Sequence, residues 1–303
     1  MLSLIYIASN GRSGSTLLDM ILGAHEACWT TGELQVLAHE VQLPTKPCGC
    51  GKMVDECGFW KPIMEGCRDL LQDESFNLFR ERMGAGRVLR WSQLWRIMFS
   101  MKGEAVRRYA EVNMRLMEKI LTAVRKEKGP QVDHLVDASK DPYRLSALMS
   151  SPDINVKAIH LVKDPRAFVY SMTKNISGRR LLYRSVRMSL RYLVENTIID
   201  IACRALPANR RYLLCYEDLA SNPEVSLDRL CDHLGFKRDA EAVGRFREVQ
   251  HGVSGNLARH EDRPISLDRR WRRDMPRALQ VLVYGLAWPQ AVRYGYRWSD
   301  NRD

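Results

Sequence analysis

A short run of small residues with one arginine, Ser9-Asn-Gly-Arg-Ser-Gly-Ser-Thr16, follows an apolar N-terminal stretch. Its spacing approaches that of the ATP-binding loop G-x-x-x-x-G-K-[ST], whose backbone N–H groups hold phosphates. Gly14 and Thr16 fit that pattern, but Ser15 stands where the lysine belongs and the cation, Arg12, lies upstream. The loop and the start of the next helix can still bind an anion, without the usual metal geometry. The alternative is a Gly/Ser turn that only caps a helix.

A second polar turn follows the apolar stretch 156–162. Lys163 and Arg166 lie in the turn, and Ser171 lies about two helical turns further on. This pattern predicts a second anion site at the end of another strand. Two separate anion sites suit a nucleotide that carries phosphates at both its 5′ and 3′ ends. The alternative interpretation of this segment is a charged surface turn.

Strand-like and helix-like patterns alternate through most of the chain. Short apolar strands are predicted at residues 2–8, 134–136, 156–162 and 211–216, and helices at 15–22 and within 104–128. This alternation predicts an α/β fold with a central parallel sheet flanked by helices, and ligands at the carboxyl ends of the strands. We expect a single domain over 1–303, in which a variable, helical and cysteine-containing insertion, 40–130, caps the active-site edge.

Composition narrows the choice of partners without settling it. The 303 residues carry a formal net charge of +11, which calls for an anionic partner such as a nucleotide, nucleic acid or anionic lipid. No segment is long and apolar enough to span a bilayer. The apolar N-terminus lacks the basic flank of a signal peptide, so we expect a cytoplasmic protein with reduced cysteines.

The two loops, in this order, carry a family resemblance. The chain resembles the sulfotransferases that use 3′-phosphoadenosine-5′-phosphosulfate (PAPS), and its pattern is similar to bacterial members and to the carbohydrate and tyrosylprotein branch, whose loop reads R-S-G-[ST]-[ST]. The resemblance covers 3–34, 134–176 and 211–236 and fades over 45–130. It implies sulfuryl transfer from PAPS to a hydroxyl of a carbohydrate or small metabolite, which releases adenosine 3′,5′-bisphosphate. It implies no metal in that reaction and leaves the oligomeric state unknown.

The resemblance also implies which residues hold the donor. The 5′ phosphosulfate would be bound by Arg12, Ser13, Gly14, Ser15 and Thr16. The 3′-phosphate would be bound by Lys163 and Ser171, and Arg166 would also contact it. The family usually has arginine at the first of these positions, and lysine acts there as a point charge without a bidentate fork.

Two further segments resemble the catalytic segments of the branch. Thr31-Gly-Glu-Leu34 makes Glu33 the candidate general base, which an attacking hydroxyl requires. The segment 136–144 makes Lys140, together with Arg12, the candidate for stabilising charge on the leaving phosphate. His25 and His251 are rival bases, and both are also compatible with structural roles.

The remaining nucleotide contacts are implied by two later segments. Cys215-Tyr-Glu-Asp-Leu219 resembles a strand end whose tyrosine lies beside the adenine, so Tyr216 is expected there, although it could equally be buried for packing. Ser254, Asn256 and Arg259 could complete the pocket. The late glycine-containing basic motif of the cytosolic branch is absent, and the possible substitutes are Arg259, Arg263, Arg269 and Arg270.

Aromatic and cysteine residues are concentrated in the insertion. Trp60, Trp91 and Trp95 could stack on an acceptor, although helical spacing favours a core position. Cys48, Cys50, Cys57 and Cys67 could bind zinc or form a disulfide, but the C-x-C spacing is unusual and no histidine is near in the sequence, which favours reduced thiols.

Two other functions remain as alternatives. A P-loop kinase or NTPase would use the same fold, but the missing lysine at position 15 argues against it. A protein that binds nucleic acid or an anionic membrane would account for the charge, but the basic residues are spread along the chain and form no recognisable reading motif. We therefore expect no nucleic-acid partner.

Overall fold

A computed structural model of the chain describes residues 1–40, 46–76, 103–254 and 264–298. Its centre is a five-stranded, all-parallel sheet in the order β2-β3-β1-β4-β5. The strands are β1 (Leu2–Ser9), β2 (Cys28–Thr30), β3 (His134–Lys140), β4 (Ile154–Val162) and β5 (Arg211–Cys215). The four predicted strands are confirmed. β2 was not predicted, because three residues are too few to show a period.

The helices follow the strands as the alternation predicted. They are α1 (Ser15–Gly23), α2 (Leu37–Glu40), α3 (Trp60–Gly66), α4 (Arg68–Leu71), α7 (Glu104–Lys128), α8 (Pro142–Leu148), α9 (Pro165–Thr173), α10 (Gly178–Arg204), α11 (Tyr216–Ser221), α12 (Pro223–Leu234), α13 (Arg270–Asp274) and α14 (Arg277–Arg293). None of these helices has an apolar stretch long enough to cross a membrane.

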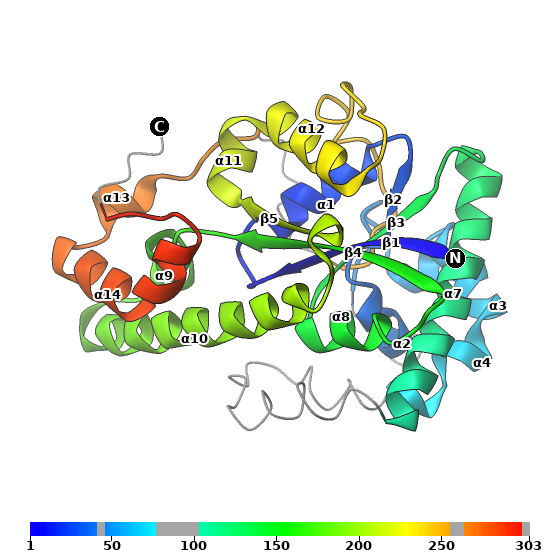
Figure 1. The fold of residues 1–303 in the computed structure, drawn as a ribbon, viewed down its shortest axis with the longest axis horizontal. Coiled ribbons are helices and arrows are strands. Elements are labelled where there is room, and N and C mark those ends of the chain that lie inside the picture. The colour runs from blue at the N-terminus through cyan, green and yellow to red at the C-terminus, as the bar shows by residue number, and fades with distance from the viewer. Residues whose placement is uncertain (41–45, 77–102, 255–263, 299–303) are drawn as a thin grey trace.

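The side chains of β1 alternate between the two faces of the sheet, as the pleat requires. Leu4 and Tyr6 pack into a core with α7, α8 and α10, whereas Ile5 and Ile7 pack against α1 and α12. Figure 1 shows these two helical layers on opposite sides of the sheet. Burial on both faces explains why the strand reads as a nearly continuous apolar run.

A second cluster of helices lies past the carboxyl end of β4. α9, α10 and α14 pack together through a buried apolar cluster that includes Phe168, Tyr192 and Val283 (Figure 1). Tyr192 also donates a hydrogen bond to the carbonyl of Lys163 at 2.7 Å. This helical group therefore fixes the turn in which the second anion site is predicted.

The described part of the insertion 40–130 packs into the main core. Trp60 is fully buried in the same apolar core as Leu116 and Met117 of α7, and its indole N–H donates to the carbonyl of His251. Trp91 and Trp95 lie outside the described residues.

A buried ion pair joins the end of β3 to the helices around it. Arg144 and Asp137 are both fully buried, and Arg144 Nε donates to Asp137 Oδ2 at 2.9 Å. Nη1 of Arg144 also donates to Asn113 Oδ1 at 2.7 Å, on α7 of the insertion. The other carboxylate oxygen of Asp137 accepts the Ser139 N–H at 2.9 Å. The pair therefore holds the last residues of β3 in place.

Arg144→Met tests this pair. The change leaves the buried Asp137 carboxylate without its charged partner, so we expect the free energy of unfolding to fall by about 3–5 kcal/mol. Urea denaturation measures it. Arg108→Met is the matched control, because Arg108 is half-exposed in its pair with Asp73 and exposed pairs contribute about 1 kcal/mol or less. Equal losses in the two variants would contradict this account.

Candidate active site

A pocket of about 690 Å³ lies where β1, β3 and β4 end. Such a volume is typical of a ligand site. Six basic and two acidic side chains line it, so an anionic ligand is favoured. These are Arg12, Lys140, Lys163, Lys174, Arg247 and Arg270, against Glu33 and Asp268.

The loop between β1 and α1 forms one wall of the pocket. Arg12 and Gly14 both have left-handed backbones, with φ of 71° and 90°. A Cβ on Gly14 would lie 2.3 Å from Cδ2 of Tyr216, so this position requires glycine for conformation and for space. Ser15 and Thr16 also line the pocket in the first turn of α1, and the N-terminus of a helix favours an anion.

Ser13 belongs to the loop but, contrary to the expectation for it, does not line the pocket. It is fully buried, and its hydroxyl has no hydrogen-bond partner within the described part of the chain. A buried hydroxyl without a partner is energetically costly.

Two similar turns lie on either side of the loop, because β3 and β4 both flank β1. Their sequences are Lys140-Asp-Pro142 and Lys163-Asp-Pro165. In each turn the aspartate caps the following helix by accepting the N–H two residues on, at 2.8 and 2.7 Å, and proline takes the first helical position. Each strand therefore ends by placing one lysine at the pocket.

The second turn brings a lysine, a tyrosine and a serine together. The Lys163 ammonium lies 4.2 Å from the ring centroid of Tyr216, and burial lowers the pKa of Lys163. Ser171, on α9, lines the same pocket and donates to the carbonyl of Phe168 at 2.7 Å. A lysine held mainly by an aromatic face in a buried site is suited to an anionic partner.

The first turn brings Lys140 to Glu33. Lys140 Nζ lies 2.6 Å from Glu33 Oε1, and each side chain is about one-fifth exposed. Lys140, with φ of 68°, is left-handed like Arg12, and Ser254 shares this conformation within the described residues. Such backbone strain in non-glycine residues collects at functional sites.

Backbone contacts hold Glu33 from behind. Its N–H donates to the carbonyl of Val253 at 2.8 Å, and the Val253 N–H donates to Thr31 at 2.9 Å. Gly32 has φ of 67°, and a Cβ there would lie 2.3 Å from the Val253 oxygen. Only glycine permits this close approach of the 251–254 segment.

Arg166 is not brought to the pocket. Its guanidinium is only 4% exposed and forms two hydrogen bonds with Asp164, at 3.0 and 2.6 Å. It also packs against the rings of Trp271, Tyr284 and Trp298. The structure thus gives Arg166 a role in shaping the turn, and the sequence contained no local sign of this aromatic enclosure.

Glu217 supports the same turn from the end of β5. Its carboxylate accepts the Asp164 N–H at 3.0 Å and the Tyr296 hydroxyl at 2.6 Å, and burial raises its pKa. The acidic residue of the Tyr-Glu-Asp segment therefore anchors the turn that presents Lys163.

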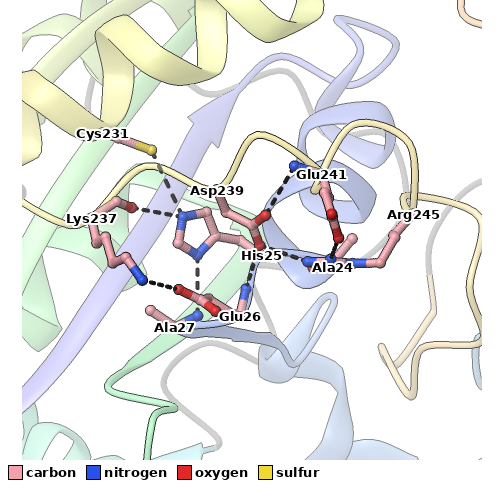
Figure 2. Close-up of polar contacts among 9 residues, drawn as sticks. All are labelled: Ala24, His25, Glu26, Ala27, Cys231, Lys237, Asp239, Glu241 and Arg245. Carbon is pink, nitrogen blue, oxygen red and sulfur yellow. Dashed lines mark hydrogen bonds and ion pairs between the residues drawn. The ribbon is translucent and has the colours of Figure 1, made fainter.

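The two rival histidines lie elsewhere. His25 is buried between two segments: Nδ1 accepts the Ala27 N–H at 3.1 Å, so Nε2 carries the proton and donates to the Lys237 carbonyl at 2.9 Å (Figure 2). Burial also lowers its pKa, which keeps the ring neutral. His251 lies against the insertion's cysteines, and neither histidine lines the pocket.

Several lining residues were not predicted. Lys174 lies one helical turn beyond Ser171, and Arg247 and Asp268 come from late loops without a motif. Arg270, a predicted substitute cation, does line the pocket, and its hydrogen bond lowers the pKa of Asp268 to about 2.

Three residues that were predicted to complete the pocket are not found among the described residues of its lining. Ser254 is described but does not line it, and Asn256 and Arg259 lie outside the described residues. None of the described residues of 40–130 lines the pocket either, so capping by the insertion stays a prediction.

Comparison with known proteins identifies the family. The model of the sulfotransferase family matches residues 5–240. The chain belongs to the sulfotransferase family. It is 26% identical over 180 residues to carbohydrate sulfotransferase 1 of Danio rerio and 25% identical over 184 residues to that of Rattus norvegicus. Each match covers 53% of this chain but only 40% and 41% of those relatives.

Solved sulfotransferase domains share the fold. The domain from the Synechococcus PCC 7002 olefin synthase superposes with a TM-score of 0.51 at 23% identity, covering 95% of this chain and 94% of the other. The domain from the curacin biosynthetic pathway gives 0.52 at 17% identity, covering 98% and 99%. These two comparisons show that the fold is shared over nearly the whole of this chain.

Gly14→Ala tests the loop geometry. A left-handed alanine costs about 1–2 kcal/mol, and its Cβ would also displace the Tyr216 ring, so we expect a loss of at least that size in the free energy of unfolding. Gly11→Ala is the matched control, because a Cβ there meets nothing within 4 Å. Urea denaturation of both variants gives the comparison. A Gly14→Ala protein as stable as Gly11→Ala would contradict the geometry.

Proposed function

We propose that this sulfotransferase moves a sulfuryl group from PAPS to a hydroxyl group of its acceptor, releasing adenosine 3′,5′-bisphosphate. The observation that carries the proposal is the pairing of two anion-binding elements in one positively charged pocket. The 9–16 loop lies at the end of β1, and Lys163 with Ser171 lies beside it after β4. A nucleotide with phosphate groups at both ends of its ribose matches that arrangement.

The described residues fit this donor. Arg12, Gly14, Ser15 and Thr16 would hold the phosphosulfate with the N-terminus of α1. Lys163 and Ser171 would hold the 3′-phosphate. Tyr216 lies against both Gly14 and Lys163, and in the proposal its ring packs beside the nucleoside between the two phosphate sites.

The chemistry then needs one base and fixed positive charge. In the proposal the acceptor oxygen attacks sulfur while Glu33 takes the hydroxyl proton. The bond from sulfur to the bridging oxygen breaks, and the electron pair stays on the leaving phosphate. Lys140 and Arg12 stabilise that charge. The 2.6 Å contact between Glu33 and Lys140 supports the proposal, because both groups reach the same point of the pocket.

The acceptor is proposed to be a hydroxyl of a carbohydrate or a small metabolite. The names of the relatives support a carbohydrate, although the match spans about two-fifths of their length. Family membership favours sulfuryl transfer over the kinase alternative, which the serine at position 15 also opposes. Positive charge gathered inside a pocket favours a small anion over nucleic acid or a membrane.

Glu33→Gln tests the assignment of the base. With PAPS and a panel of carbohydrate acceptors, we expect the turnover rate to fall by about 10²–10⁴-fold, because the hydroxyl loses its proton acceptor. Affinity for the bisphosphate product should stay nearly unchanged. Turnover is measured as the release of the bisphosphate, which chromatography detects.

Glu241→Gln is the matched control, because Glu241 is 80% exposed on the surface and lies outside the pocket lining. It should turn over like the unaltered chain. A Glu33→Gln variant with full turnover would remove Glu33 from the mechanism, and an unaltered chain that transfers sulfuryl to no member of the panel would count against the proposed acceptor class.

A further inference from the structure

Three cysteines and one histidine converge on a single point next to the insertion. The described residues Cys48, Cys50, Cys57 and His251 each place one ligand atom within 4.8 Å of the others. His251 lies 194 residues beyond Cys57 in the chain. No histidine is near the cysteines in the sequence, as expected, but the fold brings this one to them. Cys67, the other candidate ligand, is not in the group.

Four of the distances between these ligand atoms are close to those expected around a tetrahedral ion, and all of the distances are below 4.8 Å. Cys57 Sγ lies 3.5 Å from Cys48 Sγ and 3.7 Å from Cys50 Sγ, and His251 Nδ1 lies 3.2 and 3.6 Å from Cys57 and Cys48 Sγ. Tetrahedral zinc would separate its ligands by roughly 3.8 Å for two sulfurs and 3.6 Å for sulfur and nitrogen. The sulfurs are too far apart for a disulfide, which needs about 2.05 Å.

We propose that these four residues form a structural zinc site. Three thiolates and one imidazole are the donors that zinc prefers, and four protein ligands leave no open position for a reacting water. The site is also enclosed, because Cys48 and Cys57 are buried and the His251 ring stacks on Phe59 with centroids 5.3 Å apart. Nothing in this site requires the ion to take part in sulfuryl transfer.

The zinc site lies directly behind the candidate base. The Gly49 N–H donates to the carbonyl of Gly252 at 2.9 Å, and the Ser254 N–H donates to Pro47 at 3.1 Å. The same segment, through Val253, accepts the Glu33 N–H at 2.8 Å. Zinc would therefore fasten the cysteine loop to 251–254 and hold the backbone of Glu33 in place. This consequence rests on the proposed function, whereas metal binding itself does not.

The test is the metal content of the full-length chain. After purification with zinc and removal of loose ions by gel filtration, mass spectrometry of the metal should find about one zinc per chain. Cys57→Ala and His251→Ala should reduce it to background. Cys67→Ala, a buried cysteine outside the group, should retain it.

Cobalt replacement in the unaltered chain keeps the test independent of whether the variants fold. Bound Co²⁺ should show the visible bands of a tetrahedral site and charge-transfer bands from thiolates. A folded, unaltered chain that takes up neither zinc nor cobalt would overturn the proposal, and so would loss of zinc from Cys67→Ala equal to that from Cys57→Ala.

Activity separates the two proposals. An unaltered chain that holds zinc but transfers no sulfuryl group would leave the zinc site standing and count against the proposed function. A chain that turns over substrate but never binds metal would support the proposed function and count against the zinc site.

Discussion

Parallel pairing of β1 with both β3 and β4 is the constraint on which the pocket depends. Because all three strands run the same way, the loop or turn after each strand lies at one edge of the sheet. β1 leads into the loop with Arg12, β3 ends at Lys140 and β4 is followed by Lys163. Like charges gathered in this way repel one another, so the fold must hold them by other means. The buried Asp137–Arg144 pair holds the end of β3, and Glu217, Asp164 and Arg166 hold the turn after β4.

The segments with strong local signals could be predicted from the sequence. The apolar run of β1, the glycine loop and the two Lys-Asp-Pro turns are each determined by neighbouring residues, and the structure places them as expected. Arg166 shows where such inference fails: its neighbours in sequence suggest a phosphate ligand, but aromatic rings from the distant C-terminal segments enclose it. Lys174 and Arg247 reach the pocket through tertiary packing that no motif encodes. His251 joins the cysteines for the same reason.

The two sites share one segment, which gives the chain a physical link between stability and function. Residues 251–254 contact the cysteine loop on one side and the segment that carries Glu33 on the other. A carboxylate acting as a base must be held where its proton donor will lie, and small displacements of such groups cost much of the rate. A metal-bound anchor behind Glu33 is one way to supply rigidity just beyond the short strand β2. If both proposals hold, the insertion supports the site through residues 251–254.

The proposed pocket binds a nucleotide with phosphate groups at both ends of its ribose and needs no magnesium to do so. Calorimetric titration with adenosine 3′,5′-bisphosphate, compared with ATP and Mg²⁺, tests it most directly. We expect the bisphosphate to bind in the absence of metal and ATP with Mg²⁺ to bind far more weakly. Lys163→Met should weaken binding of the bisphosphate selectively. Binding of ATP with Mg²⁺ but not of the bisphosphate would contradict it and favour a kinase-like site.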